Sequence, residues 1–216
     1  MSDPLLLAFD TSGPHCAAAL IEGGRVKDSR IEGMAKGQAE RLLGLAEELL
    51  KDNGASFADI SAIGVGVGPG NFTGIRISVA AARGLALSTG APAIGVTSFE
   101  ALAYGLPRPV VVCLDARRDA FYLQVFEDSG GSEPQLINAE DFARLALPNG
   151  ASCVGSAAAS AAARCDGRLK SPLCPLADAI GQIAITKLGR VQPRPAPLYL
   201  RPADAVPAAA PPKILT

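Results

Sequence analysis

The sequence predicts a duplicated α/β fold with mixed sheets and a reduced second half. Residues 5–10 and residues 110–115 are both apolar, strand-like runs that end in an aspartate, and they begin 105 residues apart. A short polar turn, an apolar return strand and a Gly-Gly turn follow each run, which indicates an internal repeat. An apolar strand ending in Asp is also a common way to enter a turn, so the repeat has a purely local alternative. The 216 residues suffice for one large or two small domains.

The first half reads as an antiparallel opening followed by alternating helices and strands. We expect strands over residues 5–10, 16–21 and 25–31, with a Glu-Gly-Gly turn before the third. Leucines and alanines at helical spacing predict a helix over residues 38–52, which Asn53-Gly54 ends. Further elements are expected as a strand at 62–67, a helix at 73–88, a strand at 93–96 and a short helix from Thr97-x-x-Glu100, a capping box, to about residue 104.

The second half begins after turn-forming residues at 104–109. Its expected elements are strands at 110–115 and 121–126, helices at 138–145, 157–165 and 178–188, and short strands at 152–155 and 168–170. From residue 193 onward, seven of 24 residues are proline, which predicts an extended tail. We therefore expect a first domain over residues 1–106, a reduced second domain over 107–192 and a Pro-rich tail over 193–216.

Composition excludes several classes of function. The net charge is −1, from 20 basic and 21 acidic residues, so the chain lacks the basic excess of a free-standing nucleic-acid binder. His15 is the only histidine, which argues against a zinc-peptidase site or a histidine-based triad. Five cysteines without a C-x-x-C pair are expected to be reduced packing residues. No run is long enough to span a membrane, and we expect a cytoplasmic protein without a tightly bound metal.

Two strand ends could bind a phosphate and a metal ion. Asp10-Thr11-Ser12-Gly13 and Asp115 each follow an apolar strand, and this placement resembles the paired phosphate loops of actin-like ATPases. There, backbone N–H groups and hydroxyls face an anion while a carboxylate holds a hydrated cation. The alternative is that Asp10 and Ser12 form an Asx turn and bind nothing.

A glycine-rich stretch over residues 66–76 precedes the second long helix. Its glycines permit positive φ angles and close backbone approach, as at an anion site on a helix N-terminus. The alternative is a tight turn in which Asn71 or Thr73 caps the helix. Together with the two aspartate loops, the residues that we predict for a nucleotide or phosphate site are Asp10, Thr11, Ser12, Gly68, Pro69, Gly70, Thr73, Gly74 and Asp115.

The same stretch closely resembles a family signature. Gly-Pro-Gly-Asn-Phe-Thr-Gly-Ile-Arg at residues 68–76 is similar to the Gly-Pro-Gly-Ser-Phe-Thr-Gly-Leu-Arg of the TsaB (YeaZ) family. The Leu-Leu-Ala-Phe-Asp-Thr-Ser opening, Gly-Val-Thr-Ser at 95–98, Leu-Asp-Ala-Arg at 114–117 and Pro-Leu-Tyr-Leu-Arg at 197–201 agree with it. The match is specific over residues 5–127 and weak between about 130 and 190.

The resemblance implies a duplicated ribonuclease-H-like, actin-like fold and a subunit that supports catalysis without performing it. In this family the partner TsaD transfers threonylcarbamoyl to a tRNA adenosine next to the anticodon, and the ATPase TsaE is a further partner. The resemblance also implies a homodimer when TsaD is absent, tRNA contact only through the complex, and ATP or ADP with Mg²⁺ only at the complex interface. TsaD-type proteins carry two metal-binding histidines on one helix, where this chain has Gln38 and Glu40. Asn71 also replaces the usual Ser.

Two enzyme classes compete with this interpretation. Relatives have been described as M22 peptidases or glycoproteases, but one histidine leaves neither a metal site nor an activated nucleophile. A stand-alone kinase of the same fold would need an adenosine-binding subdomain, for which the second half offers little room.

The two long helices of the first half carry surplus apolar residues, so they are either sandwiched within the domain or half-buried by another chain. The second alternative fits a helical interface, which is how the resemblance implies that the chain contacts TsaD. A carboxylate at Leu45 or Val79 is then expected to abolish partner binding while leaving the chain folded, unless these positions belong to the intramolecular core. The predicted interface residues are Leu42, Leu45, Leu49, Ile75, Arg76, Val79, Ala82, Arg83 and Ala86.

Overall fold

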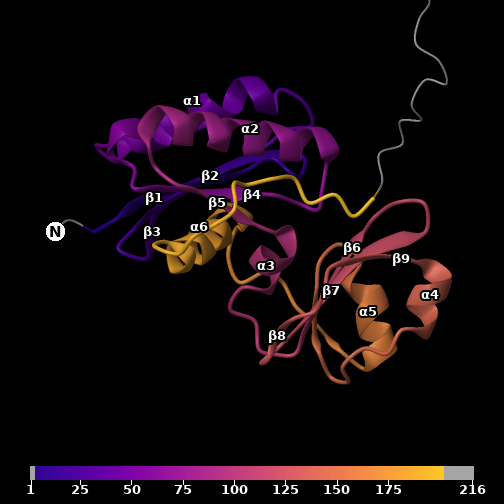
Figure 1. Ribbon diagram of the computed structural model, residues 1–216. Helices are drawn as coiled ribbons and strands as arrows, with labels where there is room; N and C mark the ends of the chain where they lie inside the picture. The colour runs from indigo at the N-terminus through magenta and orange to yellow at the C-terminus, as the bar shows by residue number, and fades with distance from the viewer. Residues whose placement is uncertain (1–2, 202–216) are drawn as a thin grey trace, which may run out of the picture.

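The computed structural model describes residues 3–201 and contains two mixed β-sheets (Figure 1). In the first sheet the strand order is β3-β2-β1-β4-β5. β1 pairs antiparallel with β2 and parallel with β4, because the chain returns to β4 through a helix rather than through a hairpin. The strands of this sheet are β1 (Leu5–Asp10), β2 (His15–Glu22), β3 (Arg25–Gly33), β4 (Ala62–Gly66) and β5 (Ala93–Val96).

Helices cover both faces of the first sheet. α1 (Gln38–Asp52) and α2 (Phe72–Thr89) lie on one face, and α6 (Leu176–Lys187) lies on the other (Figure 1). The alternation of side chains along β1 explains the two layers: Leu7 and Phe9 pack with α1 and α2, whereas Leu6 and Ala8 pack with α6. A short 3₁₀ helix, η1 (Phe57–Asp59), connects α1 to β4.

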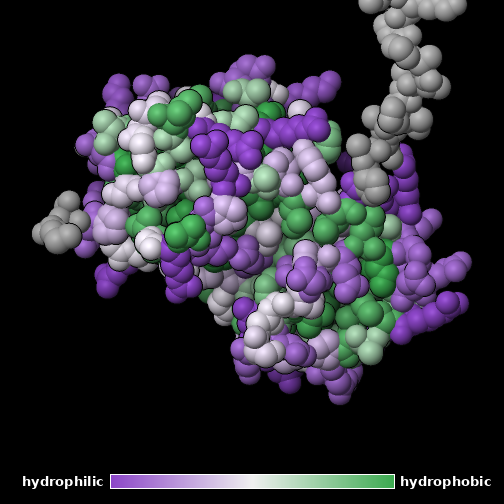
Figure 2. Space-filling model, viewed as in Figure 1, coloured by the Kyte–Doolittle hydropathy of each residue, from purple (hydrophilic) through white to green (hydrophobic). Residues whose placement is uncertain are grey.

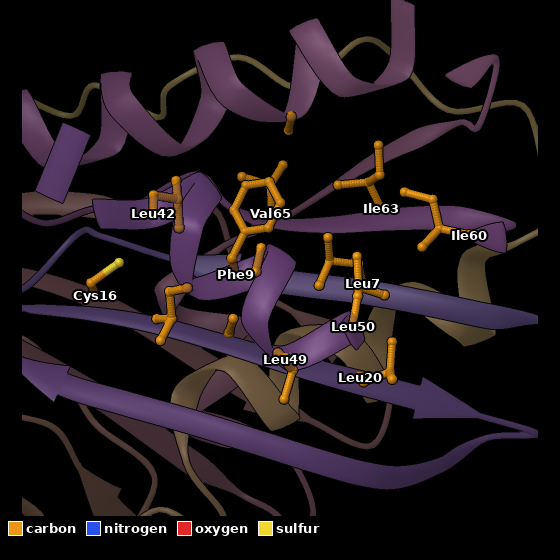
Figure 3. Packing of buried hydrophobic residues seen from close by; sticks show 14 of the residues in the cluster. Leu7, Phe9, Cys16, Leu20, Leu42, Leu49, Leu50, Ile60, Ile63 and Val65 are labelled. Carbon is orange, nitrogen blue, oxygen red and sulfur yellow. The ribbon is translucent and has the colours of Figure 1, made fainter. Parts of the chain in front are cut away.

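The side chains between the sheet and the α1/α2 layer form the largest apolar cluster (Figure 3). Leu7 and Phe9 of β1 and Val65 of β4 belong to the same cluster as Leu42 and Leu49 of α1, and all of them are fully buried (Figure 3). At about 25 cal/mol per Å² of apolar surface, this burial is the main stabilising contribution of the first half. The two helices are therefore part of its core.

The placement of α6 corrects the sequence-based division. That division puts residues 176–187 in the second domain, but α6 packs against β1, β2 and β4 of the first sheet. Its apolar residues pack against the face of that sheet opposite to α1 and α2. Gly181 permits the close approach, since a Cβ there would lie 2.4 Å from the side chain of Ile21. The chain thus returns to complete the first half after building the second.

The second sheet has the order β11-β10-β6-β7-β8, with β9 also paired to β7. α4 (Ala139–Arg144) and α5 (Ala158–Cys165) cover one face of it, and α3 (Ser98–Ala103) packs between this sheet and α6. The predicted capping box of α3 is confirmed. The strands are β6 (Val110–Asp115), β7 (Ala120–Glu127), β8 (Gly130–Gly131), β9 (Gln135–Asn138), β10 (Ser152–Val154) and β11 (Arg168–Leu169). The fold class is confirmed, whereas β8 and β9 were not predicted, and the glycines of the expected Gly-Gly turn form β8.

The residues after α6 cross from the first half to the second as an extended strap, residues 193–201. The backbone N–H of Leu198 donates to the carbonyl of Val67 (2.8 Å), and Leu198 contacts clusters in both halves. The strap ends where Arg201 donates to the carbonyl of Ala116 (2.7 Å). The predicted Pro-rich tail is thus docked as far as residue 201, and its remainder lies outside the described residues. No helix within residues 3–201 is long and apolar enough to cross a membrane.

One buried carboxylate destabilises the first half at neutral pH. Asp178 of α6 is 7% exposed, and its Oδ1 has no hydrogen-bond partner in the part of the chain that the structure describes. Burial raises the pKa of Asp178, and a hydrogen bond with Ser29 offsets only part of that rise. Because its pKa is higher in the folded than in the unfolded state, ionisation of Asp178 costs stability, and the cost grows as the pH rises above the unfolded-state value of about 3.9.

We expect Asp178→Asn to raise the thermal midpoint of the chain by a few degrees at pH 7 and to have less effect near pH 3.5, where both states hold the proton. Thermal unfolding followed by circular dichroism across this range measures the difference. Asp128→Asn, at an exposed turn, is the matched control and should show no comparable pH dependence. A constant difference between Asp178→Asn and the parent chain at all pH values would contradict the assignment.

Candidate functional site

The loop after β1 holds a fully buried aspartate. Oδ1 of Asp10 accepts hydrogen bonds from the backbone N–H of Ser12 (2.9 Å), the hydroxyl of Ser12 (2.8 Å) and Nε2 of His15 (2.8 Å). This is the Asx turn that the sequence allowed as an alternative. The one histidine of the sequence therefore orients the Asp10 carboxylate from β2.

The second oxygen of Asp10 faces the interior. Oδ2 is buried and has no hydrogen-bond partner among residues 3–201. It lies so close to Gly66 that a Cβ on that glycine would be 1.9 Å away, and Ile180 of α6 borders the same space. The backbone of β4 and an apolar side chain of α6 therefore lie next to this oxygen.

The glycine-rich loop packs directly on the Asp10 loop. Oγ1 of Thr11 donates to the carbonyl of Gly74 (2.6 Å), and the N–H of Asn71 donates to the carbonyl of Ser12 (2.7 Å). A Cβ on Gly74 would lie 1.8 Å from the carbonyl oxygen of Thr11, and one on Gly70 would lie 2.6 Å from that of Ser12. Glycine at these positions lets two backbones touch, as the sequence predicted, but what approaches is the chain itself.

The N-terminus of α2 is capped by its own loop. Oδ1 of Asn71 accepts hydrogen bonds from the N–H groups of Thr73 and Gly74, both at 3.0 Å. An anion at this helix end would have to displace the Asn71 side chain. Asp10 and the helix N-terminus together therefore do not fit a Mg²⁺-phosphate group in the arrangement observed, and we assign no step to a nucleotide.

The second aspartate loop has a different construction. Asp115 is exposed; its N–H donates to Oγ of Ser156 (2.9 Å), and its Oδ1 accepts from the N–H of Arg117 (2.7 Å). Within residues 3–201 no hydrogen bond or ion pair connects Asp115 to Asp10, so the structure does not bring the two loops together through a direct contact. Further groups that sequence reasoning missed are three consecutive residues with left-handed φ angles of 60°, 53° and 53°: Arg117, Arg118 and Asp119.

Most of the predicted partner-contact residues lie inside the first half. They belong to the apolar cluster between the sheet and the α1/α2 layer, with exposures of 3% or less, because the inner faces of both helices cover β1 and β4. The assignment of these residues to a surface is wrong. Leu45 and Val79 are core positions, for which the sequence-based alternative expects a carboxylate to unfold the chain. The buried members are Leu42, Leu45, Leu49, Ile75, Val79 and Ala82.

The other three predicted contact residues lie on or near the surface of α2. Arg76 stacks over the ring of Phe72 (3.7 Å to the centroid), and its Nε donates to the hydroxyl of Tyr199 in the strap (2.8 Å). Arg83 donates to the carbonyl of Pro195 (2.8 Å), and Ala86 is half-buried. Both arginines therefore hold the strap against α2.

The outer face of the α1/α2 layer contains residues that the sequence-based assignment left out. Leu43 of α1 is 45% exposed, and Ala80 and Gly84 of α2 are also exposed. Figure 2 shows green and pale surface interspersed with purple over the part of the molecule where Figure 1 places these helices. At helical spacing Leu43 lies away from the face that Leu42, Ala46 and Leu49 share, and this was the signal available in the sequence.

Metal-ligating clusters and reactive thiols are two features that could carry chemistry. Among residues 3–201 no group of three or more His, Cys, Asp and Glu side chains is placed to hold a metal ion. All five cysteines are free, and burial raises the pKa of Cys113 and of Cys153 to about 12, so their reactive thiolate forms are scarce at neutral pH.

Comparisons with known proteins agree on one family. A model of the family "TsaD: tRNA N6-adenosine threonylcarbamoyltransferase" matches residues 32–176. The "tRNA threonylcarbamoyladenosine biosynthesis protein TsaB" of Escherichia coli is 36% identical over 122 residues, which are 54% of this chain and 52% of that protein. The protein of the same name from Bacillus subtilis is 33% identical over 61% of this chain and 59% of its own. The chain thus spans roughly half the length of the curated relatives that it matches.

Solved structures extend the similarity to nearly the whole chain. YeaZ from Pseudomonas aeruginosa has a TM-score of 0.74 at 29% identity, covering 91% of this chain and all of that one. The activator of the 2-hydroxyisocaproyl-CoA dehydratase from Clostridium difficile, with bound ADPNP, has a TM-score of 0.51 at 8% identity over 85% of this chain and 95% of its own, a similarity of fold alone. The chain therefore belongs to the family that the TsaD model describes and, within it, to the TsaB (YeaZ) proteins.

Proposed function

We propose that this chain is a non-catalytic subunit that binds a TsaD-type threonylcarbamoyltransferase and supports N6-threonylcarbamoylation of a tRNA adenosine. The proposal that the chain acts in tRNA modification is supported by the names of its relatives, which are tRNA threonylcarbamoyladenosine biosynthesis proteins. The family model that matches the chain is that of the transferase itself. TsaE as a further partner, and nucleotide at the interface of the assembled complex, follow from the family resemblance.

The observation that carries the partner role is the outer face of the α1/α2 layer. Leu43 is a large apolar side chain in contact with solvent, and Ala80 and Gly84 leave the backbone of α2 open to close approach by another helix. Arg41, on the same helix as Leu43, forms ion pairs with Glu48 of α1 and with Glu32 of β3, both at 2.7 Å, and these charged groups provide a polar rim.

The similarity to the TsaD model also favours a partner of related fold. Two chains that share the same helix pair can bury it against each other about an approximate two-fold axis, as in an isologous interface. We therefore propose that the helix pair of the TsaD-type protein contacts α1 and α2. A second copy of this chain would use the same face when the partner is absent.

We expect Leu43→Glu and Ala80→Glu to reduce binding to the TsaD-type protein of the same organism at least about tenfold, because each introduces a charge into an interface that excludes water. Isothermal calorimetry with the purified proteins measures the loss, and circular dichroism verifies that the variants fold. Leu169→Glu is the matched control, because Leu169 is a 62% exposed apolar residue of the second sheet. Binding by both variants at the level of the control would contradict the assignment of this face.

A further inference from the structure

A groove of about 820 Å³ lies beside the C-terminal half of α2, where the start of β5 meets the segment that follows α6. In Figure 1 this segment is yellow and runs below α2 toward the second sheet. The side chains lining the groove include four cations and no carboxylate: Arg83, Lys187, Arg190 and Arg194. The whole chain has a net charge of −1, so positive charge is concentrated here locally.

Most of this positive charge is not neutralised. Lys187 forms an ion pair with Glu100 at 2.7 Å, and Arg83 donates to the carbonyl of Pro195, which carries no net charge. Arg190 and Arg194 are exposed, and within residues 3–201 neither side chain forms a hydrogen bond or an ion pair. The ion pair therefore cancels one of the four charges and leaves three available to an anion.

The shape of the groove suits a strand of anions better than a single compact ion. Arg190 and Arg194 lie on an irregular segment, and four residues of extended chain span at most roughly 14 Å. One strand of a nucleic-acid duplex carries a charge about every 3.4 Å along its axis, so this length matches several phosphates. Leu87, 89% exposed, and Val191, fully exposed, add apolar contacts for sugars or bases.

We propose that this groove binds the phosphodiester backbone of RNA. Arginine forks match phosphate oxygens in a bidentate manner, and a groove without carboxylates does not repel the strand. The inference rests on the proposed function in one respect, since the RNA is taken to be the tRNA that the complex modifies. It goes beyond that function because this chain then contacts the tRNA directly, in addition to the contacts that its partner makes.

The test compares two double variants with equal loss of charge. Arg190→Ala with Arg194→Ala removes the two unpaired cations, whereas Arg25→Ala with Arg168→Ala removes two exposed arginines from other strands. Fluorescence anisotropy measures binding of labelled tRNA to the complex with the TsaD-type protein, from about 0.05 to 0.3 M salt. We expect the groove variant to bind about tenfold more weakly at 0.15 M and to lower the salt slope by about 2, because two phosphate contacts are lost. The control should stay within about twofold of the parent chain.

Several results would overturn the proposal. Equal losses in both double variants would mean that net charge alone matters, and no loss in the groove variant would mean that RNA binds elsewhere. Competition by polyglutamate as effective as by unlabelled RNA would assign the groove to an acidic protein, and competition by millimolar inorganic phosphate would assign it to a small anion. If the complex does not assemble, the proposed function fails. The same variants are then compared for tRNA binding by the chain alone at 0.05 M salt. Weaker binding by the groove variant alone supports the groove, and equal binding by both double variants overturns it.

Discussion

Gly74→Ala should destabilise the chain by about 3 kcal/mol, whereas Gly84→Ala, ten residues further along α2, should stabilise it by up to about 1 kcal/mol. A Cβ at residue 74 would lie 1.8 Å from the carbonyl oxygen of Thr11, which is backbone and cannot rotate away. The first turn of α2 would have to retreat from the loop after β1. The hydrogen bonds of Thr11 to Gly74 and of Asn71 to Ser12 would then lengthen or break.

The control isolates the steric cause. Gly84 is exposed in the same helix, and a Cβ there would meet no atom of residues 3–201 within 4 Å outside its own stretch of helix, so alanine changes only helix propensity. Urea unfolding of both variants measures the two free energies against the parent chain. If Gly74→Ala were as stable as Gly84→Ala, the contact between the two loops would be looser than the structure has it. That result would contradict our interpretation that these glycines serve loop packing rather than anion binding.

Local pattern was sufficient to predict most of the fold. Apolar strands and helical spacing placed β1, β4, α1 and α2 to within two residues, because these elements bury a regular stripe or a whole strand. β9 (Gln135–Asn138) was missed because it is short, half-exposed and follows a proline, so that its pairing with β7 depends on tertiary contact. The position of α6 on the first sheet was also beyond local pattern, since its apolar residues fit either sheet.

For the candidate site, the sequence predicted which residues form the turns better than it predicted their contacts in the fold. The sequence allowed an Asx turn at Asp10 and a tight turn capped by Asn71 or Thr73 as alternatives to a phosphate site, and the structure contains both turns in contact with each other. The sequence alone could not show that the two loops form hydrogen bonds with each other. The left-handed turn at Arg117 to Asp119 contains no glycine or asparagine, so its positive φ angles could not be predicted. The docking of the strap depends on residues far apart in the sequence.

Helix faces were the weakest part of the prediction. α2 is apolar or small on nearly every side, so helical spacing alone does not tell which side faces the sheet. α1 buries a broad stripe that includes Leu45, although that residue lies away from the line through Leu42, Ala46 and Leu49. The distinction between core and interface therefore depends on the exposure that only the folded chain shows.

Leu45→Glu should unfold the chain, whereas Leu43→Glu, two residues earlier in α1, should leave it folded. Leu45 is fully buried in the cluster beneath α1, and Leu43 is 45% exposed. Removing the buried leucine and placing a carboxylate there without a partner costs about 5 kcal/mol or more, which is comparable to the whole stability of a typical domain. Val79→Glu and Ala80→Glu form a second such pair on α2, where Val79 is 3% exposed.

The four variants separate core from interface by measurement. We expect Leu45→Glu and Val79→Glu to lose the cooperative thermal transition and the sharp near-ultraviolet signal, and Leu43→Glu and Ala80→Glu to retain both. Partner binding should be lost in all four, but only in the second pair from a folded chain. If Leu45→Glu folds cooperatively but no longer binds the partner, Leu45 belongs to the interface and not to the core. The reason is that an unpaired carboxylate is tolerated only where water reaches it in the isolated chain.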